Sequence, residues 1–350
     1  MNRPFERELA VAIQCVREAA RLCRSVAREI SPEVLAKKDK SPVTVADFGS
    51  QALICRALAA LFPHDPVIAE EDAVELKRPE NANILQQVLR HVGAVRCETV
   101  ARAGDNIDGE LVCRWIDHGG GSDNRQRFWT LDPIDGTKGF LRGEQYAVAL
   151  ALVVDGQVMV AALACPNLSG ETSDGHVERR TNSGGSIFHA ASGQGAYFVA
   201  DKSAGDDVPG PMAITVSRRD QPADVRFCES VEAGHSAQGD AASVAARIGI
   251  IAPPLRMDSQ AKYAVVARGE ADLYLRLPTR ADYREKIWDH AAGALIVTEA
   301  GGVVTDITGR PLEFHHGREL AANRGVIVSN GPLHSRIIEA VQSLGIGAES

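Results

Sequence analysis

Apolar residues recur at helical spacing in several stretches of the first hundred residues. In the first stretch Leu9, Ile13 and Val16 fall three or four positions apart, which places them on one face of a helix. The second stretch opens at Asp47 and ends before Pro63, a residue that stops helices. The pattern therefore predicts helices over residues 5–30, 46–62 and 80–92.

Two short apolar runs predict buried strands that end in acidic residues. Residues 67–69 read VIA and lead directly into Glu70 and Glu71. Residues 128–131 read FWTL and lead into Asp132. Carboxylates that follow buried strands have no obvious structural task, so these positions are candidates for function.

Longer apolar runs predict a β-hairpin. Residues 146–154 and 157–165 are joined by Asp155 and Gly156, a pair that favours the tight turns of two-residue hairpins. Polar, Gly-rich composition predicts long surface loops on either side of this region, over residues 98–127 and 167–186.

Composition changes near residue 200, where residues 201–211 are rich in Gly, Pro and Asp. We expect a boundary here between an N-terminal α+β domain, residues 1–205, and a C-terminal α/β domain, residues 206–350. Beyond the boundary helices and strands alternate, which is typical of α/β layers. The expected helices cover residues 242–248, 260–267 and 289–300, and the expected strands cover residues 273–277 and 326–329.

Charge and cysteine content narrow the class of protein. The chain has 350 residues and a net charge of −8, which argues against a general nucleic-acid binder. The chain has seven cysteines, an odd number, and they are scattered along the sequence without a Cys-x-x-Cys pair. This pattern argues against a disulfide framework and against a structural zinc site. With no signal peptide and no apolar run of membrane-spanning length, we expect a cytoplasmic, soluble protein.

Candidate ligands for a cation are carboxylates from separate parts of the chain. They are Asp47 at a predicted helix start, Glu70 and Glu71, Asp132 and Asp135 on one turn, and Asp289 where another helix begins. Taken singly, such residues are more often helix caps or turn residues. Converging on one pocket, they would repel by roughly 4 kcal/mol per pair at about 4 Å unless cations neutralised them. Oxygen-only ligands favour Mg²⁺, with Mn²⁺ and Ca²⁺ as alternatives.

A phosphate site is predicted beside the paired carboxylates. Residues 132–137 read DPIDGT, in which Gly136 lets the backbone approach a ligand and Thr137 adds a hydroxyl donor. The sequence has no P-loop, no HExxH zinc motif and no GxSxG nucleophile motif. Metal-dependent chemistry on a phosphate ester is the function that this combination favours.

These motifs together resemble the Mg²⁺-dependent, lithium-sensitive phosphatase superfamily of inositol monophosphatase and fructose bisphosphatase. The resemblance rests on Asp47, Glu70-Glu71, the DPIDGT segment and residues 288–293, which read WDHAAG. Within the superfamily the chain looks most like the 3'(2'),5'-bisphosphate nucleotidases. Supporting segments are residues 41–44 (SPVT), 231–236 (VEAGHS), 258–263 (DSQAKY) and 274–278 (YLRLP). The implied fold is a layered αβαβα sandwich.

The resemblance implies a role for each matching residue. Two or three Mg²⁺ ions would be held by Glu70, Asp132, the Ile134 carbonyl, Asp135 and Asp289. Asp47 and Thr137, with Glu70, would act on the attacking water. The implied substrate contacts are Gly136, Thr137, His235, Ser259, Lys262 and Arg276.

The implied reaction removes the 3'-phosphate of adenosine 3',5'-bisphosphate to give AMP, with 3'-phosphoadenylyl sulfate as a second substrate. We expect in-line attack by a metal-activated water without a phosphoenzyme, inhibition by Li⁺, and a monomer that binds neither nucleic acid nor membranes. The closest alternative is an inositol phosphate or inositol polyphosphate 1-phosphatase with the same metal core. A nucleotide sensor that binds without turnover is the alternative outside enzymes.

Overall fold

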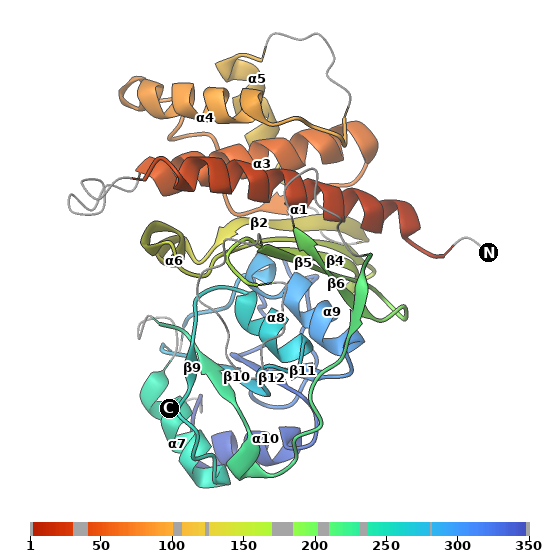
Figure 1. Ribbon diagram of the computed structural model, residues 1–350, viewed down its shortest axis with the longest axis vertical. Helices are drawn as coiled ribbons and strands as arrows, with labels where there is room; N and C mark the ends of the chain where they lie inside the picture. The colour runs from red at the N-terminus through yellow and green to blue at the C-terminus, as the bar shows by residue number, and fades with distance from the viewer. Residues whose placement is uncertain are drawn as a thin grey trace.

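Five layers alternate between helices and sheets in the computed structural model of the protein (Figure 1). The expected αβαβα sandwich is therefore confirmed. The structure describes residues 3–30, 41–100, 107–122, 126–169, 185–201, 210–231, 237–280 and 282–347.

The first layer consists of helices that cover one face of the first sheet. Its members are α1 (Glu6–Ala27), α3 (Ser41–Leu61), α4 (Ala82–Ala94) and α5 (Gly109–Asp117). Helix α1 buries the apolar face that its periodicity predicts, with Ala12, Val16 and Ala19 fully inaccessible. Helix α3 is apolar around most of its surface, because it lies between α1, α4, α5 and the sheet.

The first sheet has seven strands in the order β1-β2-β3-β4-β5-β6-β7. Strands β1 and β2 are parallel, and the others pair antiparallel. Alternate residues of β3 point to opposite faces: Leu150 and Leu152 join the core under α1 and α3, whereas Ala149 and Ala151 join the core on the other side. The strands are β1 (Val67–Ala69), β2 (Arg127–Asp135), β3 (Ala147–Val154), β4 (Gln157–Cys165), β5 (Gly185–Ala191), β6 (Ala196–Asp201) and β7 (Met212–Ile214).

Helices α8 (Ala261–Ala267) and α9 (Ala291–Glu299) form the middle layer and are buried between the two sheets (Figure 1). The second sheet has the order β11-β12-β10-β8-β9. Helices α7 (Gln238–Ile248) and α10 (His334–Ser343) cover its outer face through a third core cluster. The second-sheet strands are β8 (Phe227–Glu229), β9 (Leu255–Arg256), β10 (Leu273–Arg276), β11 (Val303–Thr305) and β12 (Val326–Ser329).

Short elements complete the chain. A six-residue helix, α6 (Thr137–Arg142), follows β2 directly. Three 3₁₀ turns are described: η1 (Pro79–Asn81), η2 (Pro222–Asp224) and η4 (Ile287–Asp289).

The predicted hairpin is confirmed. Asp155 and Gly156 both have positive φ, 50° and 78°, as a tight two-residue turn between β3 and β4 requires. The second sheet places β10 and β12 where strands were predicted.

Other predictions were wrong. Residues 98–127 are not one long loop, because α5 occupies Gly109–Asp117 and is capped by Asp108, whose side chain accepts from the Leu111 N–H. Its short apolar face of Val112, Cys113 and Ile116 is hidden in the sequence between polar flanks. Of the predicted loop over residues 167–186, residues 167–169 form no helix or strand, residues 170–184 lie outside the described residues, and residues 185 and 186 belong to β5.

The proposed division at residues 205 and 206 separates most of the first sheet from the second. Strand β7 comes after this division yet pairs with β6, so the first sheet receives an edge strand from the C-terminal part. Helices α8 and α9 from the same part pack on the first sheet. The two parts thus share one continuous core.

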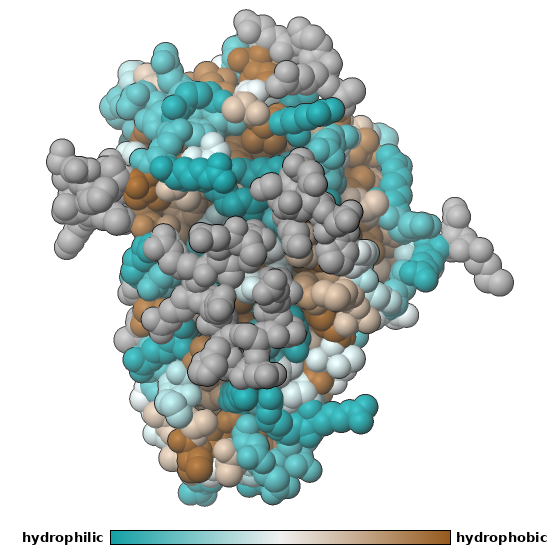
Figure 2. Space-filling model, in the orientation of Figure 1, coloured by the Kyte–Doolittle hydropathy of each residue, from teal (hydrophilic) through white to brown (hydrophobic). Residues whose placement is uncertain are grey.

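The surface shows hydrophilic and hydrophobic residues mixed in small patches on the face drawn in Figure 2. Within the described ranges, every helix is too short or too polar to cross a membrane.

Candidate active site

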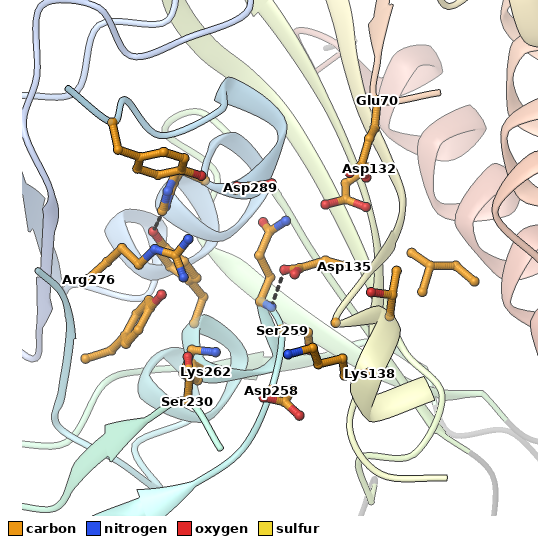
Figure 3. Close-up of a pocket in the computed structure, with 18 residues that line it drawn as sticks. Glu70, Asp132, Asp135, Lys138, Ser230, Asp258, Ser259, Lys262, Arg276 and Asp289 are labelled. Atoms are coloured by element: carbon orange, nitrogen blue, oxygen red, sulfur yellow. Dashed lines mark hydrogen bonds between the residues drawn. The ribbon is translucent and has the colours of Figure 1, made fainter. Parts of the chain in front are cut away.

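One cavity lies where the first sheet meets the middle helices and the second sheet (Figure 3). It is lined by residues from segments far apart in the chain. Predicted site residues that line it are Glu70, Asp132, Ile134, Asp135, Gly136, Thr137, Ser259, Lys262, Arg276 and Asp289. His235 lies outside the described residues.

Asp132 and Asp135 reach the same cavity because of an irregularity in β2. Residues three apart on a regular strand point to opposite faces of the sheet. Here Asp132 pairs with Ala149 while Asp135 pairs with Ala147, so β2 contains one extra residue between them. This β-bulge turns both carboxylates toward the cavity. The pair lies within the strand, not on the turn that the sequence predicted.

Glu70 comes beside Asp132 through the parallel pairing of β1 and β2. The register aligns Ala69 with Leu131, so the next residue on each strand emerges at the same end. Burial, followed by the charges of Glu71 and Asp135, raises the pKa of Glu70 to about 7. The parallel pair therefore concentrates negative charge at one edge of the sheet.

Asp47 is close enough for its charge to act on Asp132 but does not line the cavity. It lies inside α3, which begins at Ser41, so the predicted position at a helix start was wrong. Burial, followed by the charges of Glu71 and Glu70, raises the pKa of the Asp47 carboxyl well above its usual range. Glu71 itself is held by Gln51, whose side chain bonds both its N–H (3.1 Å) and its carbonyl (2.6 Å).

Asp289 approaches from the C-terminal part of the chain. It closes the 3₁₀ turn η4, and α9 begins two residues later. Burial, followed by the charge of Asp135, raises the pKa of Asp289 well above its usual range, although Arg276 opposes this. Figure 3 shows Asp289 across the cavity from Asp132 and Glu70.

The arrangement fits a hard divalent cation. Burial and the charges of Glu70, Asp135, Asp289 and Asp47 raise the pKa of Asp132 well above its usual range. Oδ1 of Asp132 and Oδ1 of Asp47 are buried, and neither has a hydrogen-bond partner in the described part of the chain. Buried carboxylate oxygens without partners are costly unless a cation binds them. All the donors are oxygens, the ligands that Mg²⁺ prefers.

Gly136 and Thr137 form the turn that follows the bulge. Gly136 has φ of 86°, a left-handed conformation that other residues rarely adopt. A Cβ at this position would lie 2.9 Å from the Cβ of Ser259, so the glycine also permits a close approach between two site segments. Thr137 is exposed to the cavity and opens α6.

The opposite wall of the cavity carries two basic side chains. Arg276 Nε donates to both carboxylate oxygens of Glu285, at 3.1 and 3.0 Å. Lys262 is 4% exposed, and its Nζ donates to the Met257 carbonyl and lies 5.1 Å from the centre of the Tyr274 ring. Burial lowers the pKa of Lys262. This wall can receive an anion while the acidic wall receives cations.

A buried network holds Arg276 in place. Glu285 also contacts His290 Nε2 at 3.3 Å, and His290 Nδ1 lies 2.7 Å from the Tyr263 hydroxyl. This series of hydrogen bonds fixes the orientation of the Arg276 guanidinium. Glu285, His290 and Tyr263 were not among the site residues predicted from the sequence.

Several further residues line the cavity that sequence reasoning passed over: Lys138, Ser230, Asp258, Gln260, Tyr263, Tyr274, Tyr283 and His290. Some signals were available. Tyr274 lies two positions before Arg276 on β10 and so shares its face. Tyr263 and Gln260 belong to the DSQAKY segment, from which only Ser259 and Lys262 were selected.

The chain is similar to known proteins over nearly its whole length. The sequence model of the inositol monophosphatase family matches residues 5–345. A 3'(2'),5'-bisphosphate nucleotidase of Emericella nidulans is 45% identical over 355 residues, covering 97% of this chain and 99% of that protein. A probable 3'(2'),5'-bisphosphate nucleotidase 4 of Arabidopsis thaliana is 42% identical, covering 97% and 95%.

Solved structures share the fold. Mycobacterium tuberculosis SuhB aligns with a TM-score of 0.61 and 22% identity, covering 99% of this chain and 100% of that one. An inositol monophosphatase from Anabaena aligns with a TM-score of 0.60 and 18% identity, covering 97% of each chain.

Proposed function

The chain belongs to the inositol monophosphatase family, and on this premise we propose that it is a Mg²⁺-dependent 3'(2'),5'-bisphosphate nucleotidase. Its substrate is adenosine 3',5'-bisphosphate, which loses the 3'-phosphate to give AMP and phosphate. 3'-Phosphoadenylyl sulfate is a second substrate in this proposal. The observation that carries it is the pairing, in one cavity, of an acidic wall with a basic wall.

The acidic wall binds the cations and the phosphate that is removed. Glu70, Asp132, Asp135, Asp289 and the Ile134 carbonyl would hold two or three Mg²⁺ ions. Bound Mg²⁺ would supply Lewis-acid chemistry, activating water and neutralising the phosphate charge. Li⁺ inhibition belongs to the same proposal.

The chain's own residues orient the reactants. The Gly136 backbone and the Thr137 hydroxyl contact the phosphate, and Asp47 and Thr137, together with Glu70, align the attacking water. Water attacks phosphorus opposite the leaving 3'-oxygen and releases a proton to the solvent as the new P–O bond forms. The P–O3' bond breaks, and the leaving oxygen takes up a proton from the solvent. No phosphoenzyme forms, so a trapped phosphoryl-enzyme would contradict this mechanism.

The basic wall selects a substrate with a second anionic group. Arg276 offers a planar guanidinium fixed by Glu285, and Lys262 offers a compact charge next to the Tyr274 ring. Together with Ser259 and His235, they would contact the nucleotide. The two walls explain why a bisphosphate, and not a simple monophosphate, is the preferred substrate. A cytoplasmic, monomeric enzyme completes the proposal.

Phosphate release from the purified protein tests the assignment. The panel is adenosine 3',5'-bisphosphate, 3'-phosphoadenylyl sulfate, inositol 1-phosphate, inositol 1,4-bisphosphate and fructose 1,6-bisphosphate, each with and without Mg²⁺ and with added Li⁺. We expect Mg²⁺-dependent, Li⁺-sensitive turnover that prefers the adenosine bisphosphate. A preference for inositol phosphates would keep the metal centre and overturn the nucleotide assignment. Nucleotide binding without turnover of any compound would indicate a sensor.

A further inference from the structure

We propose that Gln260 is a positioning residue that sets the separation between Asp135 and Asp289, two metal ligands from different parts of the chain. The inference rests on the metal centre of the proposed function and does not depend on which phosphate ester is the substrate. Gln260 is 2% exposed and lies between the segments that carry the two carboxylates.

The backbone of Gln260 holds Asp135. Its N–H donates to Oδ2 of Asp135 at 2.6 Å, the hydrogen bond drawn in Figure 3. A bond to a charged acceptor at this distance is strong and directional. It orients the carboxyl group of Asp135 about its side-chain torsion and so decides which oxygen faces the cavity.

The preceding residue aims this N–H. Ser259 has φ of 67°, a left-handed conformation that costs on the order of 1 kcal/mol or more for a residue other than glycine. Its hydroxyl accepts from the Ala261 N–H at 3.1 Å, which stabilises the turn. Strained backbone of this kind persists where the surrounding structure requires it, and here the turn packs closely against Gly136.

The side chain of Gln260 holds the Asp289 segment. Nε2 donates to the Trp288 carbonyl at 2.9 Å, and Oε1 accepts from the Gly293 N–H at 3.2 Å. These two backbone groups lie on either side of Asp289 along the chain. One buried amide therefore fixes the end of η4 relative to the first turn of α9.

The consequence is a preformed spacing between like charges. Asp135 and Asp289 repel each other, and without a connection their segments could move apart in the metal-free protein. Gln260 touches both segments and is itself uncharged, so it joins them without adding to the repulsion. Residues that orient metal ligands without binding the metal change its affinity by about 10- to 100-fold when they are mutated.

Direct titration with Mn²⁺, followed by electron paramagnetic resonance of the free ion, tests the role without any substrate. Gln260→Met keeps the length of the side chain and removes both of its hydrogen-bonding groups, so the contacts to the Asp289 segment are lost while the backbone N–H that holds Asp135 remains. We expect the Mn²⁺ dissociation constant to rise by about 10- to 100-fold. The control is Gln194→Met, a half-buried glutamine that donates to the Pro4 carbonyl and does not line the cavity, for which we expect a change within about twofold.

Two further measurements separate positioning from folding. If Gln260→Met fails to fold, Gln260→Asn keeps the amide but is too short to reach both partners, and it should also weaken Mn²⁺ binding. At saturating Mg²⁺ the kcat of a folded variant should recover to within about tenfold of wild type, because every ligand is present. Mn²⁺ affinity within about twofold of wild type in the folded variants would overturn the proposal. Absence of nucleotide turnover by the wild type would instead overturn the proposed function.

Discussion

The guanidinium of Arg318 lies 4.5 Å from the centre of the Trp288 ring and donates to the carbonyl of Ala69 at 2.6 Å. It thereby connects the end of β1, which precedes Glu70, to the segment that carries Asp289. The backbone around Arg318 strengthens the connection, since the Ile287 N–H donates to its carbonyl at 3.1 Å. Two acidic segments separated by more than two hundred residues are thus joined through one arginine.

Replacing Arg318 with glutamine should destabilise the metal-free protein. The change removes the cation–π contact and the charge-assisted bond to Ala69, which together contribute about 2 kcal/mol. The measurement is the midpoint of urea unfolding without metal. Arg280→Gln is the control, because Arg280 forms an exposed pair with Asp282 and such pairs contribute little. An equal, small shift in both variants would show that Arg318 does not connect the segments.

Asp132→Asn should inactivate the enzyme and yet stabilise its metal-free form. Asp132 is buried among like charges that raise its pKa, so removing its charge relieves repulsion at neutral pH. We expect a higher melting temperature without metal and activity lower by at least about 10²-fold. The variant should also lose stabilisation by Mg²⁺, which for wild type reaches about 2.7 kcal/mol at a concentration of about 100 Kd.

Thermal denaturation with and without Mg²⁺ measures both effects of Asp132→Asn. The control is Asp282→Asn at an exposed carboxylate paired with Arg280, which should respond to Mg²⁺ as wild type does. A metal-free melting temperature below that of wild type would contradict the electrostatic account.

Arg276→Ala should impair recognition of the second phosphate. A charge-assisted contact contributes about 1.5–3 kcal/mol, so we expect KM for adenosine 3',5'-bisphosphate to rise by about 10- to 100-fold. For adenosine 3'-monophosphate, which lacks the second phosphate, the rise should be much smaller. Steady-state kinetics on both substrates measure the difference. Equal losses on both would mean that Arg276 has only a structural role.

Because Arg276→Ala leaves the buried Glu285 without its arginine partner, Arg276→Lys serves as the matched variant. Lysine keeps the positive charge but lacks the planar guanidinium, whose Nε donates to both Glu285 oxygens. Its KM for the bisphosphate should fall between those of wild type and Arg276→Ala.

His189, which does not line the cavity, should make the free energy of unfolding depend on pH. It lies on β5 with 5% exposure, stacked on Tyr197 with ring centres 5.8 Å apart, and burial followed by the charge of Arg17 lowers its pKa from 6.5 to about 4. Between these values the unfolded chain binds a proton that the folded chain does not. The contribution of the neutral His189 to the free energy of unfolding is therefore fully present above pH 6.5, and it is lost as the pH falls toward 4.

The His189→Phe variant isolates this contribution. Relative to the variant, wild type should lose about 2 kcal/mol of unfolding free energy between pH 7 and pH 5. Urea unfolding at both pH values measures the difference. Parallel pH profiles for the two proteins would show that His189 is not buried in its neutral form.

Much of the fold follows from local patterns in the sequence. The periodicity of Leu9, Ile13 and Val16 predicts α1, and the Asp155-Gly156 pair predicts the turn of the β3–β4 hairpin. Local patterns failed where a short element has weak flanking signals, as with α5, or where a helix begins earlier than its apolar residues suggest, as with α3. In both cases tertiary packing stabilises a segment whose own sequence is indecisive.

The sequence by itself determined which chemical groups the site contains: acidic side chains suited to Mg²⁺, a glycine turn for phosphate, and Lys262 and Arg276 for a second anion. Only the tertiary structure decided how they meet. Packing between distant segments decides the bulge between Asp132 and Asp135 and the position of Asp47 outside the cavity lining. It also decides the contacts of Gln260 and Arg318. Local propensity acts over a few residues, whereas these arrangements form only when two sheets and three helical layers pack together.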